Sequence, residues 1–573
     1  MQNNQSTNHW DHSVDVVVVG SGNAGLTAAL CNHEMGTRNV LVLEKTGLYG
    51  GTSAIGGGGV WIPCNHYAMA AGAQDSLEDA LKYLKATTPE GAVTEDMQRA
   101  FLENGPRMLR FLHKRTRVRY VSLGEYPDYY SDAEGARTGH RQVEPEPLDI
   151  TQMEQQGDLL RGSHYMMHLL GMVPITQYEA HVFTAQLKGW VGIALKLVFG
   201  HLFDLPRRLK RKRSRRSAEG MAGVARLALS TQERGLPIWR NTEMTELLVE
   251  GGRAVGVRVN KDGKAMTIQA RKAVILASGG FERNQAMREQ YLPKPTSTEW
   301  TSGSEGNTGL PIQLAMAKGA AVKAMDGAWW CTMIKVPGEE LPRLSIMEKS
   351  YPGSVVVNQH GKRIANESMN YQKYAQECFK AQSEGTPVNP LWLIFDADFR
   401  HKYLVGPLMT GKMMPDRFLP KHFFSPEFLT RCDTLEQLAA ATGIDSGGLL
   451  ATVARMNEYA RTGVDQEFKR GSFHYDRYYG DPEVEPNNCL APIGKGPFYA
   501  IRLYLGDFGT NGGMVINTDA QVLREDGSVF EGLYAAGNCT TALLPTYPGP
   551  GSTLGPAMTF AYQAAKHINQ YRD

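Results

Sequence analysis

The sequence predicts an α/β protein in which a Rossmann-type dinucleotide-binding domain is interrupted by an inserted α+β domain. Four consecutive valines, 16–19, have the β-branched, apolar composition of a strand that is buried on both faces. A G-x-G-x-x-G motif and an Ala- and Leu-rich segment follow this strand directly, as at the start of a βαβ unit. Patterning of the same kind returns in LYAAGN from Leu533, so both ends of the chain are expected to build one domain.

The glycine motif is expected to hold the phosphates of a dinucleotide. Gly20 permits a tight turn, Gly22 lets the backbone approach a pyrophosphate, and Gly25 lets the following helix pack closely on the strand. The N-terminus of that helix offers free N–H groups and a partial positive charge to the phosphates. A second apolar strand, 39–43, ends at Glu44, whose carboxylate can accept hydrogen bonds from a ribose. The flanking strands, the helix and this acid make the prediction more specific than the glycines alone.

Composition limits the classes of protein to which the chain can belong. Its 573 residues suggest about two to four domains, and 42% hydrophobic residues are enough for a large core. A net charge of +2 gives no general affinity for nucleic acid. The seven cysteines show no CxxC pair and no metal-ligand spacing, so we expect reduced thiols, no metal site and a cytoplasmic protein. The polar N-terminus lacks the form of a secretory signal, and no apolar run is long enough to predict a spanning helix.

Changes of composition along the chain predict three parts. The dinucleotide-binding domain is expected to occupy 1–327, to give way to a catalytic domain at 328–495, and to resume at 496–573. Within the first part, six glycines lie in the stretch 50–59, directly after the second strand. A loop so rich in glycine beside a nucleotide site needs a reason to stay ordered. We therefore expect it to press against a flat ring system rather than to form a flexible surface loop.

The segment 159–217 has a different character. Apolar and aromatic residues recur in it at near-helical spacing, and the stretch 207–216 then carries eight basic residues in ten. This is the composition of an interfacial membrane anchor, in which each basic residue near an anionic leaflet contributes about 1 kcal/mol. Nucleic-acid binding and a solvated loop without a partner are the alternatives, and the aromatic residues favour lipid. The expected membrane residues are Trp190, Leu197, Arg207, Arg208, Lys210, Arg211, Lys212 and Arg213.

Three motifs resemble the flavoprotein subunit of the fumarate reductase and succinate dehydrogenase superfamily: V-G-S-G from Val19, L-E-K from Leu43 and G-G-T-S-A from Gly50. This resemblance implies FAD rather than NAD, because those proteins use the glycine-rich loop to hold the isoalloxazine. The stretch 50–59 has no histidine of the kind that tethers flavin in some members, so the FAD is expected to be non-covalent. The implied FAD contacts are Gly20, Gly22, Ala24, Gly25, Glu44, Lys45, Gly51, Thr52, Ser53, Gly58, Ala277, Gly279, Gly280, Asn307, Gly537, Asn538, Ser552 and Leu554.

Four further motifs look like the 3-ketosteroid Δ1-dehydrogenases: YPDYY from Tyr126, NESMNY up to Tyr371, LYAAGN, and YPGPGSTLGPAM from Tyr547. The similarity covers nearly the whole chain except about 159–217. The resemblance implies an FAD-dependent oxidoreductase that introduces a double bond between C1 and C2 of a 3-ketosteroid. Carried over position by position, its functional residues are Tyr129, Tyr371, Tyr547 and Gly551.

The implied reaction removes a proton and a hydride from neighbouring carbons. The Tyr547 hydroxyl and the Gly551 N–H would hydrogen-bond the C3 oxygen and promote enolisation. Tyr371 would take the C2 proton as a phenolate, which an unperturbed tyrosine with a pKa of about 10 rarely forms at neutral pH. A hydrogen bond from Tyr129 favours that charged form. The C1 hydride would pass to flavin N5, and an external, quinone-like acceptor would reoxidise the flavin.

Other functions stay open at this point. A 3-ketosteroid 4-ene (5α) dehydrogenase would share the fold and the carbonyl contacts, and a non-catalytic, membrane-associated flavin or sterol carrier would bind without turnover. A fumarate-reductase-like enzyme ranks third among the enzymes, because the region of Thr510 reads GTNGG where dicarboxylate enzymes carry a histidine. An anchored enzyme could draw a long-chain steroid such as cholest-4-en-3-one from the bilayer. The sequence therefore predicts a sterol-degrading branch, peripheral on the inner face of the cell membrane.

Overall fold

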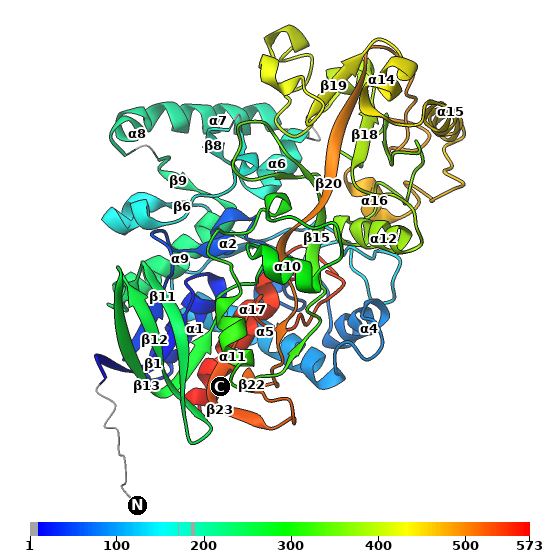
Figure 1. The fold of residues 1–573 in the computed structure, drawn as a ribbon. Coiled ribbons are helices and arrows are strands. Elements are labelled where there is room, and N and C mark those ends of the chain that lie inside the picture. The colour runs from blue at the N-terminus through cyan, green and yellow to red at the C-terminus, as the bar shows by residue number, and fades with distance from the viewer. Residues whose placement is uncertain (1–9, 170, 185–188, 212, 573) are drawn as a thin grey trace, which may run out of the picture.

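The computed structural model describes residues 10–169, 171–184, 189–211 and 213–572. Its first sheet contains five strands that run parallel to their neighbours, which confirms the Rossmann-type domain (Figure 1). A long antiparallel hairpin continues this sheet, and one short strand pairs with its last parallel strand. The parallel strands are, in sheet order, β10 (Ile238–Trp239), β2 (Val40–Leu43), β1 (His12–Val19), β13 (Lys264–Leu276) and β23 (Val529–Ala535); the hairpin is β11 (Thr242–Glu250) and β12 (Arg253–Lys261), and the short strand is β22 (Gln521–Leu523).

The four valines of β1 explain why this strand lies at the centre of the sheet. Val16 and Val18 belong to the core on one face, whereas Val17 and Val19 belong to the core on the other. Successive side chains of a strand alternate between the two faces, so burial on both faces requires an uninterrupted apolar run.

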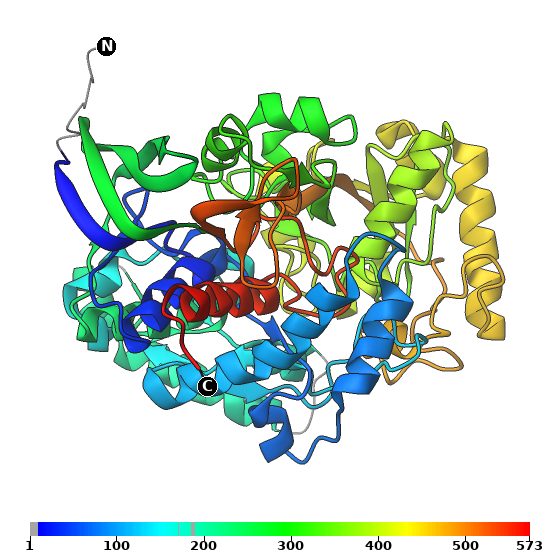
Figure 2. The same cartoon turned by 90° about the horizontal axis from the view of Figure 1, so that it is seen from below.

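Helices from both ends of the chain cover one face of this sheet. α1 (Asn23–Glu34) packs against α9 (Glu219–Glu233) and against the C-terminal helix α17 (Leu554–Ile568). α17 also packs along α5 (Glu95–Arg115), and Figure 2 shows the two helices side by side. The segment that begins α17 is thereby brought next to the N-terminal glycine motif.

A second, antiparallel sheet builds the other side of the molecule (Figure 1). Its middle strand comes from 496–573, which the sequence assigned to the dinucleotide-binding part, so this sheet joins two of the predicted parts; the domain limits themselves stay predictions. The strands are, in order, β16 (Arg343–Leu344), β15 (Ala328–Ile334), β20 (Phe498–Thr510), β18 (Leu391–Phe395) and β17 (Ser354–Val357), with β19 (Leu429–Cys432) also paired to β20. The helices beside them are α12 (Tyr371–Ser383), α14 (Leu435–Thr442) and α15 (Ser446–Thr462).

The segment 159–217 forms α6 (Gln177–Thr184), α7 (Trp190–Phe203) and α8 (Leu205–Arg211), and α7 and α8 lie at the outer edge of the molecule (Figure 1). Trp190 is exposed, as a membrane-contacting residue must be. Within the parts of the chain listed at the start of this subsection, no helix is long and apolar enough to cross a bilayer.

Two of the residues that were expected to contact a membrane do not face outward in the structure. Leu197 is only 7% exposed and packs in a small core with Val173 and Ile175, because α7 turns this side toward the rest of the segment. Arg213 is half-buried and donates hydrogen bonds to the carbonyl oxygens of Gly157 (3.1 Å) and Leu160, so it closes the base of the segment instead of facing outward. The structure therefore corrects both expectations. Lys212 lies outside the described residues.

Candidate active site

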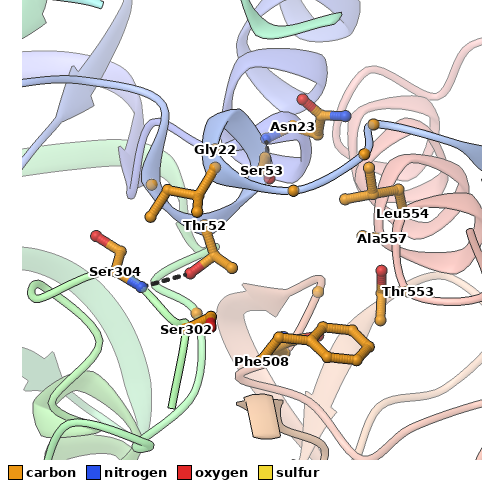
Figure 3. Close-up of a pocket in the computed structure, with 18 of the residues that line it drawn as sticks. Gly22, Asn23, Thr52, Ser53, Ser302, Ser304, Phe508, Thr553, Leu554 and Ala557 are labelled. Carbon is orange, nitrogen blue, oxygen red and sulfur yellow. Dashed lines mark hydrogen bonds between the residues drawn. The ribbon is translucent and has the colours of Figure 1, made fainter. Parts of the chain in front are cut away.

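One large cavity of about 380 Å³ lies between the two sheets. One of its walls is formed by the glycine motif, the glycine-rich loop and the start of α17. In Figure 3, Thr52 and Ser53 lie at one end of this wall and Leu554 and Ala557 at the other, with Phe508 on a further side. The opposite wall is formed by tyrosines from four distant segments of the chain. We refer to these as the glycine wall and the phenol wall.

Backbone geometry explains the glycines of the glycine wall. Gly20 has φ +111°, and a Cβ there would lie 2.2 Å from the carbonyl oxygen of Ala277. Gly58 has φ +67°, and a Cβ there would lie 2.4 Å from the backbone nitrogen of Gly220. Neither position can carry a side chain, because the conformation disfavours one and backbone atoms already occupy its place. The glycine wall is therefore made of closely packed backbone.

Glu44 is placed at the end of β2 as predicted, and it is buried. Its carboxylate accepts a hydrogen bond from the hydroxyl of Ser21 and another, of 2.8 Å, from the backbone nitrogen of Thr46. These contacts fix the acid beside the glycine motif.

Fifteen of the eighteen expected FAD contacts line the cavity. Three of them, Gly25, Gly280 and Ser552, do not line it, and each has a role in the packing or hydrogen bonding of the chain beside the cavity. A Cβ at Gly25 would lie 1.9 Å from the Gly20 carbonyl oxygen, so Gly25 allows α1 to pack on β1. A Cβ at Gly280 would meet the Thr510 hydroxyl, and the Ser552 hydroxyl donates to the Gly549 carbonyl oxygen at 2.5 Å within the turn before α17.

A hydrogen-bond network holds the glycine-rich loop. Thr52 accepts hydrogen bonds from the Ser304 backbone nitrogen (2.9 Å, Figure 3) and from the Asn307 side-chain nitrogen (3.0 Å). Asn307 also donates to Glu282, 2.6 Å away. Burial raises the pKa of Glu282 to about 7, and the hydrogen bond from Asn307 opposes that rise.

The phenol wall brings together all four residues that the resemblance indicated. Tyr129 donates a hydrogen bond of 3.3 Å to the Tyr371 hydroxyl, and the rings of Tyr371 and Tyr547 are 5.6 Å apart. Gly551 has φ +95°, and its backbone N–H acts to lower the pKa of the Tyr547 phenol, against the larger effect of burial. All four residues line the cavity.

Contacts of the neighbouring backbone hold two of these tyrosines, Tyr371 and Tyr129, in position. Tyr371 is the first residue of α12, directly after the N-cap Asn370. The buried Lys349 ammonium donates to the carbonyl oxygens of Glu367 (2.6 Å) and Met369 (2.8 Å), which holds the segment before that helix. The backbone nitrogen of Tyr129 donates to the Pro548 carbonyl oxygen at 2.9 Å and so ties the loop to the segment that follows Tyr547.

Burial dominates the electrostatics of the phenol wall. It raises the pKa of Tyr129 and Tyr371 well above the usual value for a phenol and also raises that of Tyr547. A negative charge on one phenol opposes ionisation of its neighbours, and the hydrogen bond from Tyr129 to Tyr371 acts in the opposite direction. The resting phenol wall is therefore neutral at physiological pH.

Sequence reasoning missed several residues of the cavity. Tyr126 lies inside the YPDYY motif, but the motif alone did not separate it from packing tyrosines. Tyr478 and Tyr479 lie about 350 positions away along the chain, and only the fold brings Tyr479 to within 2.6 Å of the Tyr126 hydroxyl. Glu219 also lines the cavity, and its Oε2 atom has no hydrogen-bond partner among the described residues.

The fold and the cavity define a flavin-binding oxidoreductase, and comparisons with known proteins agree. The chain matches the family described as FAD binding domain over residues 15–554. The 3-oxosteroid 1-dehydrogenase of Mycobacterium tuberculosis is 39% identical over 570 residues, which cover 97% of this chain and 98% of that protein. The 4-oxocyclohexanecarboxylate 2-dehydrogenase of Sinomonas cyclohexanicum is 36% identical and covers 97% of this chain and 92% of its own length.

A solved structure gives the same result. The crystal structure of 3-ketosteroid delta1-dehydrogenase from Sterolibacterium denitrificans, in complex with 1,4-androstadiene-3,17-dione, matches with a TM-score of 0.94 and 42% identity. The match covers 98% of this chain and 100% of that one. The chain therefore belongs to the family of FAD-dependent oxidoreductases that contains the 3-oxosteroid 1-dehydrogenases.

The glycine wall fits FAD. The N-terminus of α1 follows the glycine motif and opens into the cavity, so it can meet a pyrophosphate. Asn23 lines the same space, although its side chain points away from it (Figure 3). Gly51 and Gly57 also line it, and a Cβ at either would meet nothing within 4 Å, so the backbone leaves room there for a ligand. FAD is the cofactor that this family and this wall indicate.

Proposed function

We propose that the protein is an FAD-dependent dehydrogenase that converts 3-oxo-4-ene steroids, such as cholest-4-en-3-one, into 1,4-dienes during sterol degradation. The observation that carries this proposal is the convergence of Tyr129, Tyr371, Tyr547 and Gly551 on the cavity that also contains the glycine wall. The names of the relatives from Mycobacterium tuberculosis and Sterolibacterium denitrificans support the reaction and the substrate class.

The residues of the phenol wall can divide the work as follows. Tyr547 and the Gly551 N–H, which line the same cavity, donate hydrogen bonds to the C3 oxygen and stabilise the negative charge that develops there. This polarisation acidifies the hydrogens at C2. Tyr371 takes one of them as the general base, and Tyr129 stabilises its phenolate through the donated hydrogen bond. FAD, when bound, supplies the acceptor for the hydride that leaves C1.

The size and character of the cavity favour a steroid over a small ring. Beyond the phenols, the lining continues with apolar side chains that a single six-membered ring would leave uncovered. An unpaired carboxylate on a small substrate would be costly in such surroundings. The apolar lining residues are Met166, Met167, Ile175, Leu344, Ile346 and Met347.

Anaerobic mixing tests the proposal directly. Purified protein is mixed with cholest-4-en-3-one, androst-4-ene-3,17-dione or 4-oxocyclohexanecarboxylate, and the flavin absorbance is followed while mass spectrometry identifies the product. We expect the flavin to bleach with the two steroids and the product to be 2 mass units lighter, since one double bond is formed. A 4-ene dehydrogenase would leave these 4-ene substrates unchanged, and a carrier would bind them without bleaching.

We also propose that α7 and α8 rest on an anionic membrane surface. Large apolar side chains are exposed along these helices, and Phe203 (84%) and Leu209 (77%) are the most exposed of them. The exposed Lys210 lies beside Leu209, so charge and apolar area face the same surroundings. An enzyme held there could take its substrate from lipid and pass electrons to a quinone-like acceptor in the same bilayer.

Vesicles test this second proposal. Co-sedimentation with phosphatidylglycerol vesicles should exceed co-sedimentation with phosphatidylcholine vesicles and should fall as salt rises. A membrane-soluble quinone should reoxidise the flavin faster when the enzyme is vesicle-bound. A protein that stays in the supernatant with both kinds of vesicle would exclude the membrane contact.

A further inference from the structure

A chain of phenol hydroxyls extends beyond the three tyrosines considered so far. The hydroxyls of Tyr126 and Tyr129 are 3.4 Å apart, and those of Tyr126 and Tyr479 are 2.6 Å apart. Tyr129 in turn donates to Tyr371 at 3.3 Å. Tyr126 belongs to the same loop as Tyr129, whereas Tyr479 follows α16 (His474–Tyr478). Four hydroxyls are therefore linked in one unbroken series.

The series runs from the interior outward. Tyr371 and Tyr129 are 5% exposed and Tyr126 is 4% exposed, so none of these three reaches bulk water to a useful extent. Tyr479 is the only member of the four that is half-buried, and it lines the cavity on the side of the segment with α6. Tyr479 is thus the end of the series at which we place the exchange of a proton with water.

We propose that Tyr126 and Tyr479 extend Tyr129 into a proton relay that connects Tyr371 with solvent; this inference rests on the function proposed above. Before the substrate reacts, the Tyr371 proton passes to the Tyr129 oxygen, the Tyr129 proton to Tyr126, the Tyr126 proton to Tyr479, and the Tyr479 proton to water. Each O–H bond breaks as the next one forms, so three phenols stay neutral and only Tyr371 becomes a phenolate. The C2 proton then restores Tyr371, and one proton leaves per turnover.

The hydrogen-bond direction in the structure is that of the state after the transfers, in which Tyr129 donates to Tyr371 and stabilises its phenolate. Before the transfers the Tyr371 and Tyr129 hydroxyls must rotate, so that Tyr371 donates to Tyr129. Burial raises the pKa of all four tyrosines, so a charge that moved through them as an isolated phenolate would be costly. Concerted transfer along linked hydroxyls avoids that intermediate.

Other ionisable groups face the relay and belong in any account of its pH dependence. Tyr478 stacks on Tyr126 with ring centroids 4.7 Å apart, and His181 of α6 stacks on Tyr478 at 4.8 Å. The titratable groups around the four hydroxyls are Glu125, Glu144, His181, Cys331, Tyr475, Asp476, Tyr478 and Tyr547.

Phenylalanine variants remove single links and keep the rings. We expect Tyr126→Phe and Tyr479→Phe each to slow anaerobic flavin reduction by cholest-4-en-3-one about tenfold or more at pH 7, in the range of proton-transfer effects. Both should move the rising limb of the pH–rate profile to higher pH and change the solvent isotope effect. The double variant should be no slower than the slower single variant, because a series is broken equally by one missing link or two.

Tyr475→Phe is the matched control. Its ring packs against Tyr129 with centroids 4.8 Å apart, but its hydroxyl is not a link of the series. We expect its rate to stay within about twofold of the wild type and its pH profile to be unchanged, since no proton-transfer group is lost. FAD content and melting temperature of every variant show whether it is folded; if Tyr126→Phe does not hold FAD, Tyr479→Phe decides alone.

The outcomes separate this inference from the proposed function. A wild-type protein whose flavin does not bleach with steroid refutes the proposed function itself. If the wild type turns over and Tyr479→Phe matches it, the relay is refuted while the function stands. The relay is also refuted if the single variants are slow but keep the wild-type pH profile and their effects multiply in the double variant, because that pattern is expected of packing changes.

Discussion

The glycine wall and the phenol wall face the same cavity but handle negative charge in opposite ways. The glycine wall offers backbone N–H groups and a helix N-terminus, which suit permanently charged phosphates, and the buried Glu44, which suits the hydroxyls of a ribose. The phenol wall offers neutral hydroxyls whose pKa values burial has raised, and these suit a charge that exists only during reaction. From this difference we infer that the glycine wall binds the cofactor and that the phenol wall stabilises a charge that forms only during the proposed reaction.

The strongest way to break this division is Tyr371→Phe. Removal of one buried hydroxyl from the phenol wall leaves the glycine wall untouched, so we expect FAD to stay bound. Turnover of androst-4-ene-3,17-dione should fall about 10³-fold, because the proposed general base is lost. Steady-state kinetics measure the turnover, and the flavin-to-protein absorbance ratio measures the FAD.

Loss of FAD together with turnover would show that the two walls are not separable. The matched control is Tyr374→Phe on the same helix: Tyr374 is buried, its hydroxyl lies in the core away from the cavity, and this variant should keep both FAD and turnover.

A change in the glycine wall should instead weaken the binding of FAD. A Cβ at position 20 would lie 2.2 Å from a backbone oxygen and would sit at φ +111°, so Gly20→Ala forces the strand-to-helix turn to shift. Strained backbone of this kind costs of order 1–3 kcal/mol, which corresponds to FAD binding weaker by about 5- to 150-fold. Titration of the apoprotein with FAD measures this directly.

Gly36→Ala serves as the control for that variant. Gly36 also has a positive φ, +118°, but a Cβ there meets nothing within 4 Å, so strain without obstruction should leave FAD affinity unchanged. If both variants lose FAD equally, the loss reflects general instability and not the cradle.

The two walls also differ in how far sequence could predict them. The glycine wall lies mostly in one stretch of 40 residues, where Gly20, Gly22 and Glu44 have a spacing that the chemistry of a dinucleotide dictates. The phenol wall joins loops that are hundreds of positions apart, and Tyr129 and Tyr371 were found only through resemblance. Tyr479 had no such motif, because its contact with Tyr126 depends on tertiary packing alone.

The predicted membrane segment also shows that sequence does not reveal which side chains are buried by tertiary packing. Composition predicted the helices of 159–217 and their basic end, but not which side of α7 faces inward. Leu197 and Phe203 are both apolar residues of that helix, yet the first is 7% and the second 84% exposed. Only packing against Val173 and Ile175 decides between them.

The pH dependence sharpens the contrast between the walls. A general base acts in its deprotonated form, and burial raises the pKa of Tyr371, so the reactive phenolate is a minor species at neutral pH. The rate of flavin reduction should therefore rise with pH, by up to about tenfold per unit below the apparent pKa. FAD affinity should change little above about pH 8, where Glu282 of the loop network is already ionised. Stopped-flow reduction and FAD titration from pH 6.5 to 9.5 give both curves, and a flat rate profile would contradict a phenolate base.

The smallest expected effect concerns α7 and α8, which lie outside both walls. Phe203→Ser with Leu209→Ser removes the two most exposed apolar side chains of these helices. We expect partition onto phosphatidylglycerol vesicles to weaken about three- to fivefold, since part of the apolar area that lipid would cover is lost. Turnover of dispersed androst-4-ene-3,17-dione should be unchanged, whereas turnover of vesicle-embedded cholest-4-en-3-one should fall with the partition.

Phe418→Ser is the control, because Phe418 is equally a surface phenylalanine (64% exposed) but belongs to the segment between β18 and β19. Equal loss of vesicle binding in both variants would assign the effect to general surface hydrophobicity and would leave α7 and α8 without a specific role.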